Sequence, residues 1–132
     1  MIKYNQIKEI PKDYLNSKLN EFLEEDSPNG DITTEGTISP DSTVVAQLIA
    51  KDNLVLSGRN VVEAIFDENT QIDFNFNDGD IVANRDIIAT ISGNSIEILR
   101  KERIFLNLMQ RMSGIATTTK RYVDIAKPHN VI

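Results

Sequence analysis

The chain of 132 residues contains no cysteine and a single histidine, His129. Without cysteine, disulfide bonds, thiolate zinc sites and cysteine nucleophiles are excluded. One histidine leaves little room for histidine-based catalysis or for a metal site built from several histidines, and we expect His129 to be structural. The residues taken by themselves therefore predict no catalytic centre and no metal site.

Long hydrophobic runs are also absent. No stretch approaches the roughly 18 consecutive apolar residues that would span a bilayer, and no apolar signal segment follows Met1. We therefore expect no membrane association and a cytoplasmic location. The 20 acidic and 14 basic residues give a net charge of −6. That charge argues against nucleic-acid binding, because the field of the protein repels phosphate.

The pattern of apolar residues predicts a small α+β domain. Apolar residues at helical spacing indicate one helix over 11–23 and another over 59–66, with Ser57 as its N-cap. We expect the strand over 43–50 to be buried on most of its length and to enter the next strand through a turn at 51–53. The predicted strands are 43–50, 54–56, 71–77 and 87–91.

A long helix is predicted from Asn94-Ser95 through Met112, with Ser95 as its N-cap. Ser113-Gly114 marks its end or a kink, because glycine is favoured just after a helix. A second helix is expected over 115–126, stopped by Lys127-Pro128. The last two residues, Val131-Ile132, look like the start of a buried strand.

One arc of the long helix carries Arg100, Arg103, Asn107, Gln110 and Arg111 and contains no acidic residue. The planar fork of arginine binds carboxylate and phosphate groups through two hydrogen bonds. This arc is therefore a candidate anion site. The alternative is a solvated face, or one paired with the protein's own acids.

The remaining surface of that helix is apolar, so we expect it to be buried in a core or in a subunit contact. Glu102 falls on the apolar arc, and we expect it to be paired with a lysine or arginine rather than catalytic. Two acid-rich segments, 24–31 and 78–80, are interpreted as turns. In the first of them Pro28 occupies a place where calcium would need an oxygen ligand.

Four short motifs follow one another along the chain. They are Glu25-Asp26 with Gly30-Asp31-Ile32-Thr33-Thr34, Asp78-Gly79-Asp80, Glu102-Arg103-Ile104-Phe105-Leu106-Asn107 and Ser113-Gly114-Ile115-Ala116-Thr117. In order and spacing they resemble the N-terminal part of quinolinate phosphoribosyltransferase, over nearly the whole chain from Leu15. A sister family linked to molybdenum transport shares part of the pattern but has Trp-Lys in place of Glu102-Arg103. Family members usually carry a glycine near Arg85, so a different loop is expected there.

The resemblance implies a two-part organisation. Residues 1–114 would form an N-terminal α/β sandwich, in which flanking helices cover a hammerhead-like antiparallel sheet. Residues 115–132 would form a linker helix and the start of a C-terminal α/β barrel. The family's Thr-Arg-Lys-Thr segment would follow directly after Ile132, so most of the barrel is expected to lie outside this chain.

The resemblance also implies a function. The family joins quinolinate to phosphoribosyl pyrophosphate and yields nicotinate mononucleotide, pyrophosphate and carbon dioxide for NAD synthesis, using magnesium held on the barrel. Arg103 matches the arginine that contacts a quinolinate carboxylate in the neighbouring subunit of a homodimer. Arg100 and Arg111 match no family role and are expected to be structural. The chain alone is expected to be inactive and to bind no magnesium. The alternative is a stand-alone, non-enzymatic domain that binds small carboxylates or caps a partner subunit.

Overall fold

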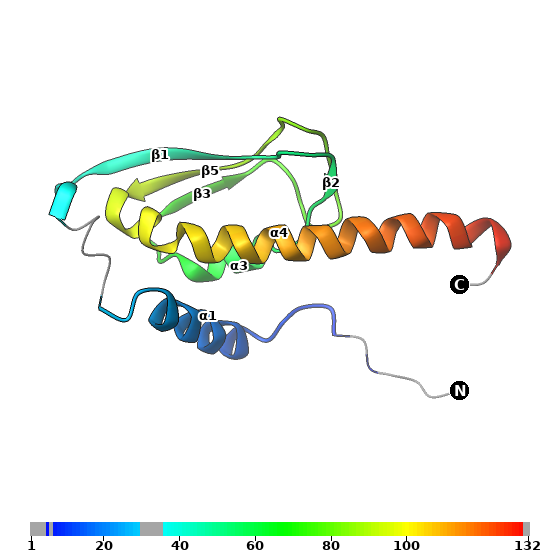
Figure 1. The fold of residues 1–132 in the computed structure, drawn as a ribbon, viewed down its shortest axis with the longest axis horizontal. Coiled ribbons are helices and arrows are strands. Elements are labelled where there is room, and N and C mark those ends of the chain that lie inside the picture. The colour runs from blue at the N-terminus through cyan, green and yellow to red at the C-terminus, as the bar shows by residue number, and fades with distance from the viewer. Residues whose placement is uncertain (1–4, 6, 30–35, 131–132) are drawn as a thin grey trace.

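The computed structural model describes residues 5, 7–29 and 36–130. Two features singled out above, the motif at 30–34 and the final pair 131–132, lie outside these residues. Figure 1 shows the arrangement of the described elements. In chain order they are α1 (Lys12–Asp26), β1 (Thr43–Ile49), β2 (Leu54–Val55), α3 (Arg59–Ile65), β3 (Gln71–Phe74), β4 (Ile81–Val82), β5 (Ile87–Asn94), α4 (Ser95–Ala126) and the short 3-10 helix η1 (Lys127–His129).

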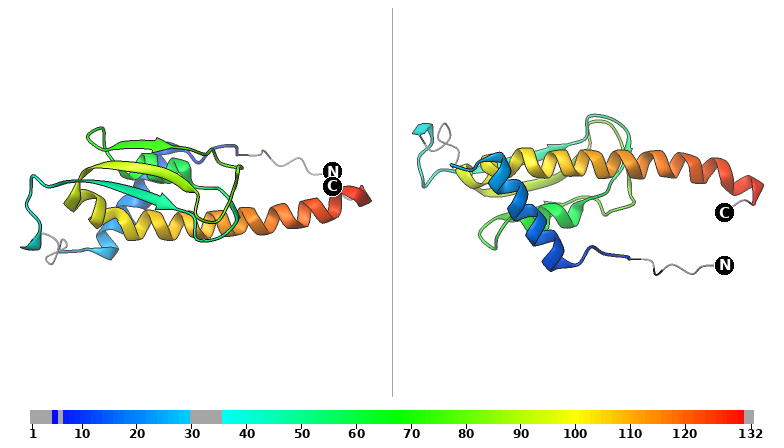
Figure 2. Two further views of the ribbon diagram at one scale, coloured as in Figure 1. Left: turned by 90° about the horizontal axis from the view of Figure 1, so that it is seen from above. Right: turned by 60° about the horizontal axis from the view of Figure 1, so that its bottom comes forward.

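The strands form two antiparallel sheets. β5 lies between β1 and β3 in the larger sheet, and β2 pairs with β4 in the smaller one. Helices cover one side of the larger sheet: α4 runs along it, α3 packs on α4, and α1 crosses below both (Figures 1 and 2). The α+β prediction, with an antiparallel sheet and flanking helices, is confirmed.

The core lies between the sheet and the helices. Phe66 and Phe105 meet there edge to face, with ring centroids 5.7 Å apart, a geometry that adds to the gain from apolar burial. Leu15 and Leu19 anchor α1 to this core, as its helical spacing predicted. The buried apolar side chains are Leu15, Leu19, Ala50, Leu56, Val61, Val62, Ile65, Phe66, Val82, Ile88, Ala89, Ile91, Ile98, Ile104, Phe105 and Met109.

The start of α4 differs from the prediction by one residue. Asn94, not Ser95, is the N-cap: its side-chain oxygen accepts the N–H groups of Ile96 at 3.0 Å and Glu97 at 3.2 Å. Ser95 is the first helical residue, and its hydroxyl lies 2.9 Å from that of Ser42 at the start of β1. Asparagine and serine are nearly equal as caps, so the local sequence did not distinguish them.

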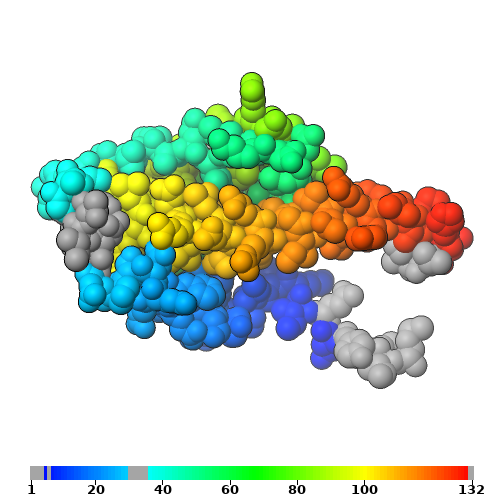
Figure 3. Space-filling model, viewed as in Figure 1, coloured from blue at the N-terminus to red at the C-terminus, as the bar shows by residue number. Residues whose placement is uncertain are grey.

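The predicted end or kink at Gly114 is wrong. α4 is a single helix of 32 residues that passes through Gly114 and ends at Ala126, as expected before Pro128. Its C-terminal part extends beyond the sheet and beyond α3 (Figures 1 and 3). The domain boundary between 114 and 115 stays a prediction, and the backbone of the helix does not mark it.

Strand β1 contradicts two expectations. It lies at the edge of its sheet and is largely exposed rather than buried, with Val45 69% exposed. The turn at 51–53 does not make a hairpin, because β1 pairs with β5 while β2 pairs with β4. β-Branched apolar residues fit both a covered and an open sheet face, so composition alone did not reveal the exposure.

Helix α3 begins after Gly58, not after a capping Ser57. Gly58 has φ = 110°, and a Cβ atom there would lie 3.3 Å from Met109 Cγ and from Met112 Sδ. Glycine therefore supplies both the backbone conformation and the close approach to α4. The cap comes from elsewhere in the chain: a carboxylate oxygen of Asp78 accepts the Arg59 N–H at 3.1 Å.

The turn after β4 contains a residue other than glycine in the left-handed backbone conformation. Arg85 has φ = 75°, in the left-handed region that glycine enters most readily. Its N–H donates to the Ala50 carbonyl at 2.9 Å. Arg85 thus adopts a conformation that glycine would enter more readily, and the different loop expected there stays a prediction. Among the helices of the described residues, none is long and apolar enough to cross a membrane.

Candidate functional site

The arginine-bearing arc of α4 faces a groove beside the C-terminal end of α1. The groove has a volume of about 520 Å³. One wall is the polar arc of α4, which contributes Arg103, Asn107, Gln110 and Arg111, and the other is α1 with Phe22, Glu25 and Asp26. Four of the five residues predicted on this arc line the groove, Arg100 being the exception, and the fold adds the opposing wall.

Arg103 forms an ion pair across this groove with Asp26 and is the more exposed of the two residues. Its Nη1 atom lies 3.4 Å from Oδ1 of Asp26, the last residue of α1. The Arg103 side chain is 75% exposed and the Asp26 side chain 27% exposed. One guanidinium nitrogen of Arg103 is thus paired with an acidic residue of the protein, as the alternative interpretation of the arc expected. The guanidinium of Arg103 makes no other hydrogen bond or ion pair within the described chain.

The other two arginines of the arc behave differently. Arg111 lines the same groove, is exposed, and has no ion-pair partner within residues 5, 7–29 and 36–130. Arg100 is half-buried and does not line this groove, and its Nε is buried without a hydrogen-bond partner in the described structure. The structure therefore brings Arg103 and Arg111 together and leaves Arg100 apart.

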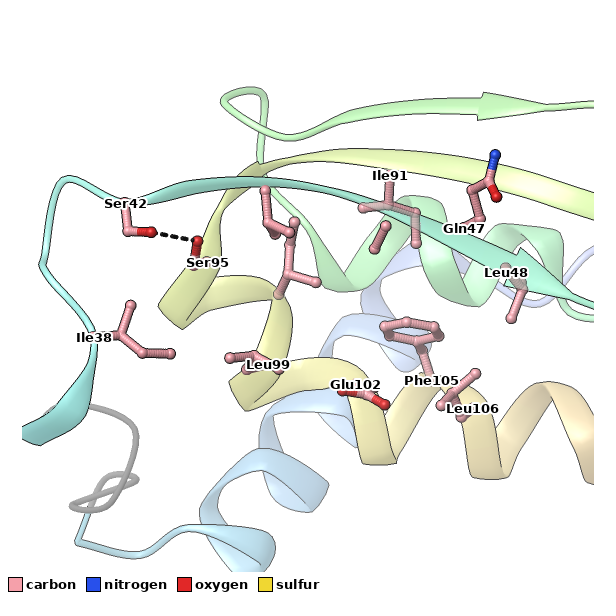
Figure 4. A pocket seen from close by; sticks show the side chains of 13 residues that line it. Ile38, Ser42, Gln47, Leu48, Ile91, Ser95, Leu99, Glu102, Phe105 and Leu106 are labelled. Carbon is pink, nitrogen blue, oxygen red and sulfur yellow. Dashed lines mark hydrogen bonds between the residues drawn. The ribbon is translucent and has the colours of Figure 1, made fainter.

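Glu102 does not occupy the buried, paired position expected of it. Its side chain is exposed and makes no ion pair with any described lysine or arginine. It lies at the rim of a second groove, of about 420 Å³, between β1 and α4 (Figure 4). Apolar side chains dominate this groove, including Leu48, Leu99 and Phe105. On the side that faces β1, helix α4 is less buried than its apolar residues led us to expect.

The acidic turn at 78–80 has a structural role, as predicted, whereas in the other acid-rich segment residues 24–26 are the last residues of helix α1 and not a turn. Asp80 accepts the Asn77 N–H at 2.7 Å and Asp78 caps α3. Within the described parts of the chain, no three side chains of histidine, cysteine, aspartate or glutamate gather where they could hold a metal ion. His129 is exposed in η1.

Sequence reasoning missed Asp26 as the partner of Arg103. The two residues are 77 positions apart, and neither helical periodicity nor any local motif connects them. The only signal was the Glu25-Asp26 pair within the motif that precedes residue 30, and it carries no information about which arginine lies opposite.

The fold and the groove together define a small α+β domain in which two arginine side chains line one groove. Comparison with known families then identifies it. The family model described as "Quinolinate phosphoribosyl transferase, N-terminal domain" matches residues 31–113. The chain belongs to this family.

Curated relatives agree with this assignment. The chain is 39% identical over 114 residues to quinolinate phosphoribosyltransferase [decarboxylating] 2a, mitochondrial, of Nicotiana tabacum, and covers 32% of that protein. It is 35% identical over 112 residues to the probable nicotinate-nucleotide pyrophosphorylase [carboxylating] of Bacillus subtilis, of which it covers 38%. These matches include 83% of this chain in both cases. The chain thus spans about a third of the length of these relatives.

Solved structures show the same fold. The nicotinate-nucleotide pyrophosphorylase of Francisella tularensis superposes with a TM-score of 0.88 at 30% identity, over 96% of this chain and 45% of that one. The NadC protein of Streptococcus pyogenes superposes with a TM-score of 0.83 at 28% identity, over 89% of this chain and 43% of that one.

Proposed function

We propose that this chain is the N-terminal portion of a quinolinate phosphoribosyltransferase. The reaction joins quinolinate to phosphoribosyl pyrophosphate and releases pyrophosphate and carbon dioxide as nicotinate mononucleotide forms. The observation that carries the proposal is the exposed guanidinium of Arg103 over the groove between α1 and α4. Arg103 stands where the family motif has its carboxylate-binding arginine.

The proposed role of Arg103 is to bind one carboxylate of quinolinate. Its guanidinium can form two parallel hydrogen bonds to a carboxylate, the geometry in which arginine binds such groups best. A hydrogen bond to a charged group contributes about 1.5–3 kcal/mol. Arg103 would supply this binding energy to the active site of the neighbouring subunit in a homodimer.

Other parts of the reaction are assigned to residues outside this chain. Catalysis requires stabilisation of the charge that develops as pyrophosphate leaves, and magnesium bound with that group would contribute to it. Within the described residues, no three histidine, cysteine, aspartate or glutamate side chains gather where they could hold a metal ion. As the resemblance to the family implies, we assign magnesium and phosphoribosyl pyrophosphate to the barrel and expect the chain alone to be inactive. The cytoplasmic location stays a prediction.

The proposal is tested by assaying nicotinate mononucleotide formation in two proteins. The purified 132-residue chain should form none, whereas a protein in which this chain is followed by the family's barrel should form it. In the longer protein, Arg103→Lys should raise KM for quinolinate, because lysine keeps the charge but loses the planar fork.

Arg111→Lys is the matched control, since Arg111 lines the same groove without a family role. Its KM for quinolinate should stay close to that of the unchanged protein. Equal effects of the two substitutions would contradict the proposed role of Arg103. Binding of quinolinate that depends on Arg103, without activity in the longer protein, would favour a stand-alone carboxylate-binding domain.

A further inference from the structure

The contact between Asp26 and Arg103 places a carboxylate of the protein on the arginine assigned to the ligand. Only one oxygen and one nitrogen take part, at 3.4 Å. Exposed ion pairs of this kind contribute little to stability, because solvent screens the charges and two side chains must be ordered. The contact is therefore one that another carboxylate could replace at small cost.

The position of Asp26 in α1 is unfavourable in the absence of Arg103. The last turn of α1 carries Glu24, Glu25 and Asp26 and no basic residue. Carboxylates at the C-terminal end of a helix are repelled by the negative end of the helix dipole. Arg103 supplies the compensating charge from across the groove.

The charges that face the groove also balance. Glu25 and Asp26 contribute two carboxylates from α1, and Arg103 and Arg111 contribute two guanidinium groups from α4. An incoming dianion such as quinolinate therefore gains little net attraction from these four groups, two of which are the protein's own carboxylates. Of the two, Asp26 is the one in contact with a guanidinium group.

We propose, on the basis of the function proposed above, that Asp26 is an internal competitor for the ligand carboxylate at Arg103. A carboxylate that makes two hydrogen bonds, through Nη1 and Nη2, displaces one that makes a single long contact to Nη1. A ligand with one weak acceptor does not. Asp26 thereby lowers the affinity for all anions and selects those that engage both nitrogens of the fork.

Removing the negative charge of Asp26 should therefore strengthen ligand binding. The test titrates quinolinate into the isotopically labelled longer protein, in which this chain is followed by the family's barrel, and follows the Nε–H resonance of Arg103 by NMR. Asp26→Asn preserves the shape of the side chain and should lower Kd about two- to fivefold, the range set by the typical strength of an exposed ion pair. Phthalate, a second aromatic dicarboxylate, should show the same change.

Glu25→Gln is the matched control, because it removes the same charge from the same groove without touching the Arg103 contact. Its Kd should change less than about 1.5-fold, since exposed charges that are not in contact are screened by salt. A ligand-free measurement accompanies the titration: Asp26→Asn should shift the Arg103 Nε–H resonance, and Glu25→Gln should leave it in place.

The outcomes separate this inference from the proposed function. Binding that is unchanged or weaker in Asp26→Asn, or equally stronger in both variants, overturns the inference while Arg103 keeps its role. An Arg103 resonance that does not respond to Asp26→Asn overturns it as well. Failure of quinolinate to bind, or binding unaffected by Arg103→Ala, contradicts the proposed function, and the inference falls with it.

Discussion

Ser113 and Ser57 hold α4 against the segment between β2 and α3 through a single hydroxyl group. The Ser113 Oγ accepts the Ser57 N–H and donates to the Ser57 carbonyl, both at 3.1 Å. One turn later, Thr117 Oγ1 accepts the Val55 N–H at 2.9 Å and donates to the Ser113 carbonyl at 2.6 Å. Two hydroxyls of the motif at 113–117 thus join the helix to the smaller sheet.

Loss of the Ser113 hydroxyl should destabilise the domain. Ser113→Ala leaves both the N–H and the carbonyl of Ser57 without a partner in a partly buried place, which should cost about 1–2 kcal/mol of the free energy of unfolding. Urea denaturation measures this change in the free energy of unfolding. Ser57→Ala is the control, because the backbone of residue 57 makes both bonds, and its stability should change much less. Equal losses in the two variants would contradict this account.

Replacement of Gly114 by alanine should stabilise the protein. Gly114 lies inside α4, and a Cβ atom there would meet no described atom within 4 Å. Alanine in a helix interior is favoured over glycine by about 0.5–1 kcal/mol. Gly58→Ala is the contrasting variant and should destabilise, because Gly58 has a positive φ and lies against Met109. A loss of stability in Gly114→Ala, measured by thermal unfolding, would indicate that the helix breaks at Gly114 after all.

Arg85→Gly should also raise stability. The left-handed conformation costs an L-residue roughly 1–2 kcal/mol, which glycine would relieve. Glycine also loses more conformational entropy on folding, which offsets about 0.5–1 kcal/mol of that gain. The expected net gain is therefore about 0.5–1 kcal/mol. Arg85→Ala removes the same side chain but keeps the Cβ atom, so its stability should stay near that of the unchanged chain. A gain in both variants would assign the effect to the arginine side chain instead.

The purified chain should self-associate through the C-terminal part of α4. The apolar face predicted on the helix up to Met112 is largely buried within the domain. The large exposed side chains lie farther along, with Ile115 at 67%, Tyr122 at 70% and Ile125 at 66%. Exposed apolar surface of this kind drives association at concentrations of about 100 μM. Sedimentation should show oligomers, and Ile125→Lys should reduce them.

Tyr14→Lys is the control for this experiment, since Tyr14 is an exposed aromatic residue on α1. It should leave the sedimentation profile unchanged. A clean monomer of the original chain at the same concentration would contradict the prediction.

The helices and the exposed polar arc of α4 could be predicted because helical periodicity is a local property. Arg103 and Arg111 lie on the polar side of their helix, where their spacing placed them. The helix continues through Gly114 because Ser113 and Thr117 bind it to a neighbouring segment on either side of that glycine. The residue pattern of the helix alone does not predict those contacts, because their partners lie in another part of the chain.

The features that could not be predicted depend on what lies across the fold. Val45 fits an open face of an edge strand as well as a covered one, and alternation of side chains does not say which faces are covered. Glu102 lies at the rim of an open groove, not within the core. The partner of Arg103 comes from a helix 77 residues earlier in the chain, so only the folded structure could identify it.

The most direct test of the account compares the binding of two ligands to one variant. In the protein that carries both this domain and the barrel, Arg103→Ala should weaken quinolinate binding roughly 10- to 200-fold, the equivalent of a lost hydrogen bond to a charged group. Calorimetric isotherms should show a much smaller change for phosphoribosyl pyrophosphate, and the melting temperature should stay nearly constant because Arg103 is exposed. Equal losses for both ligands, or a large fall in melting temperature, would contradict the assignment of Arg103 to the quinolinate carboxylate.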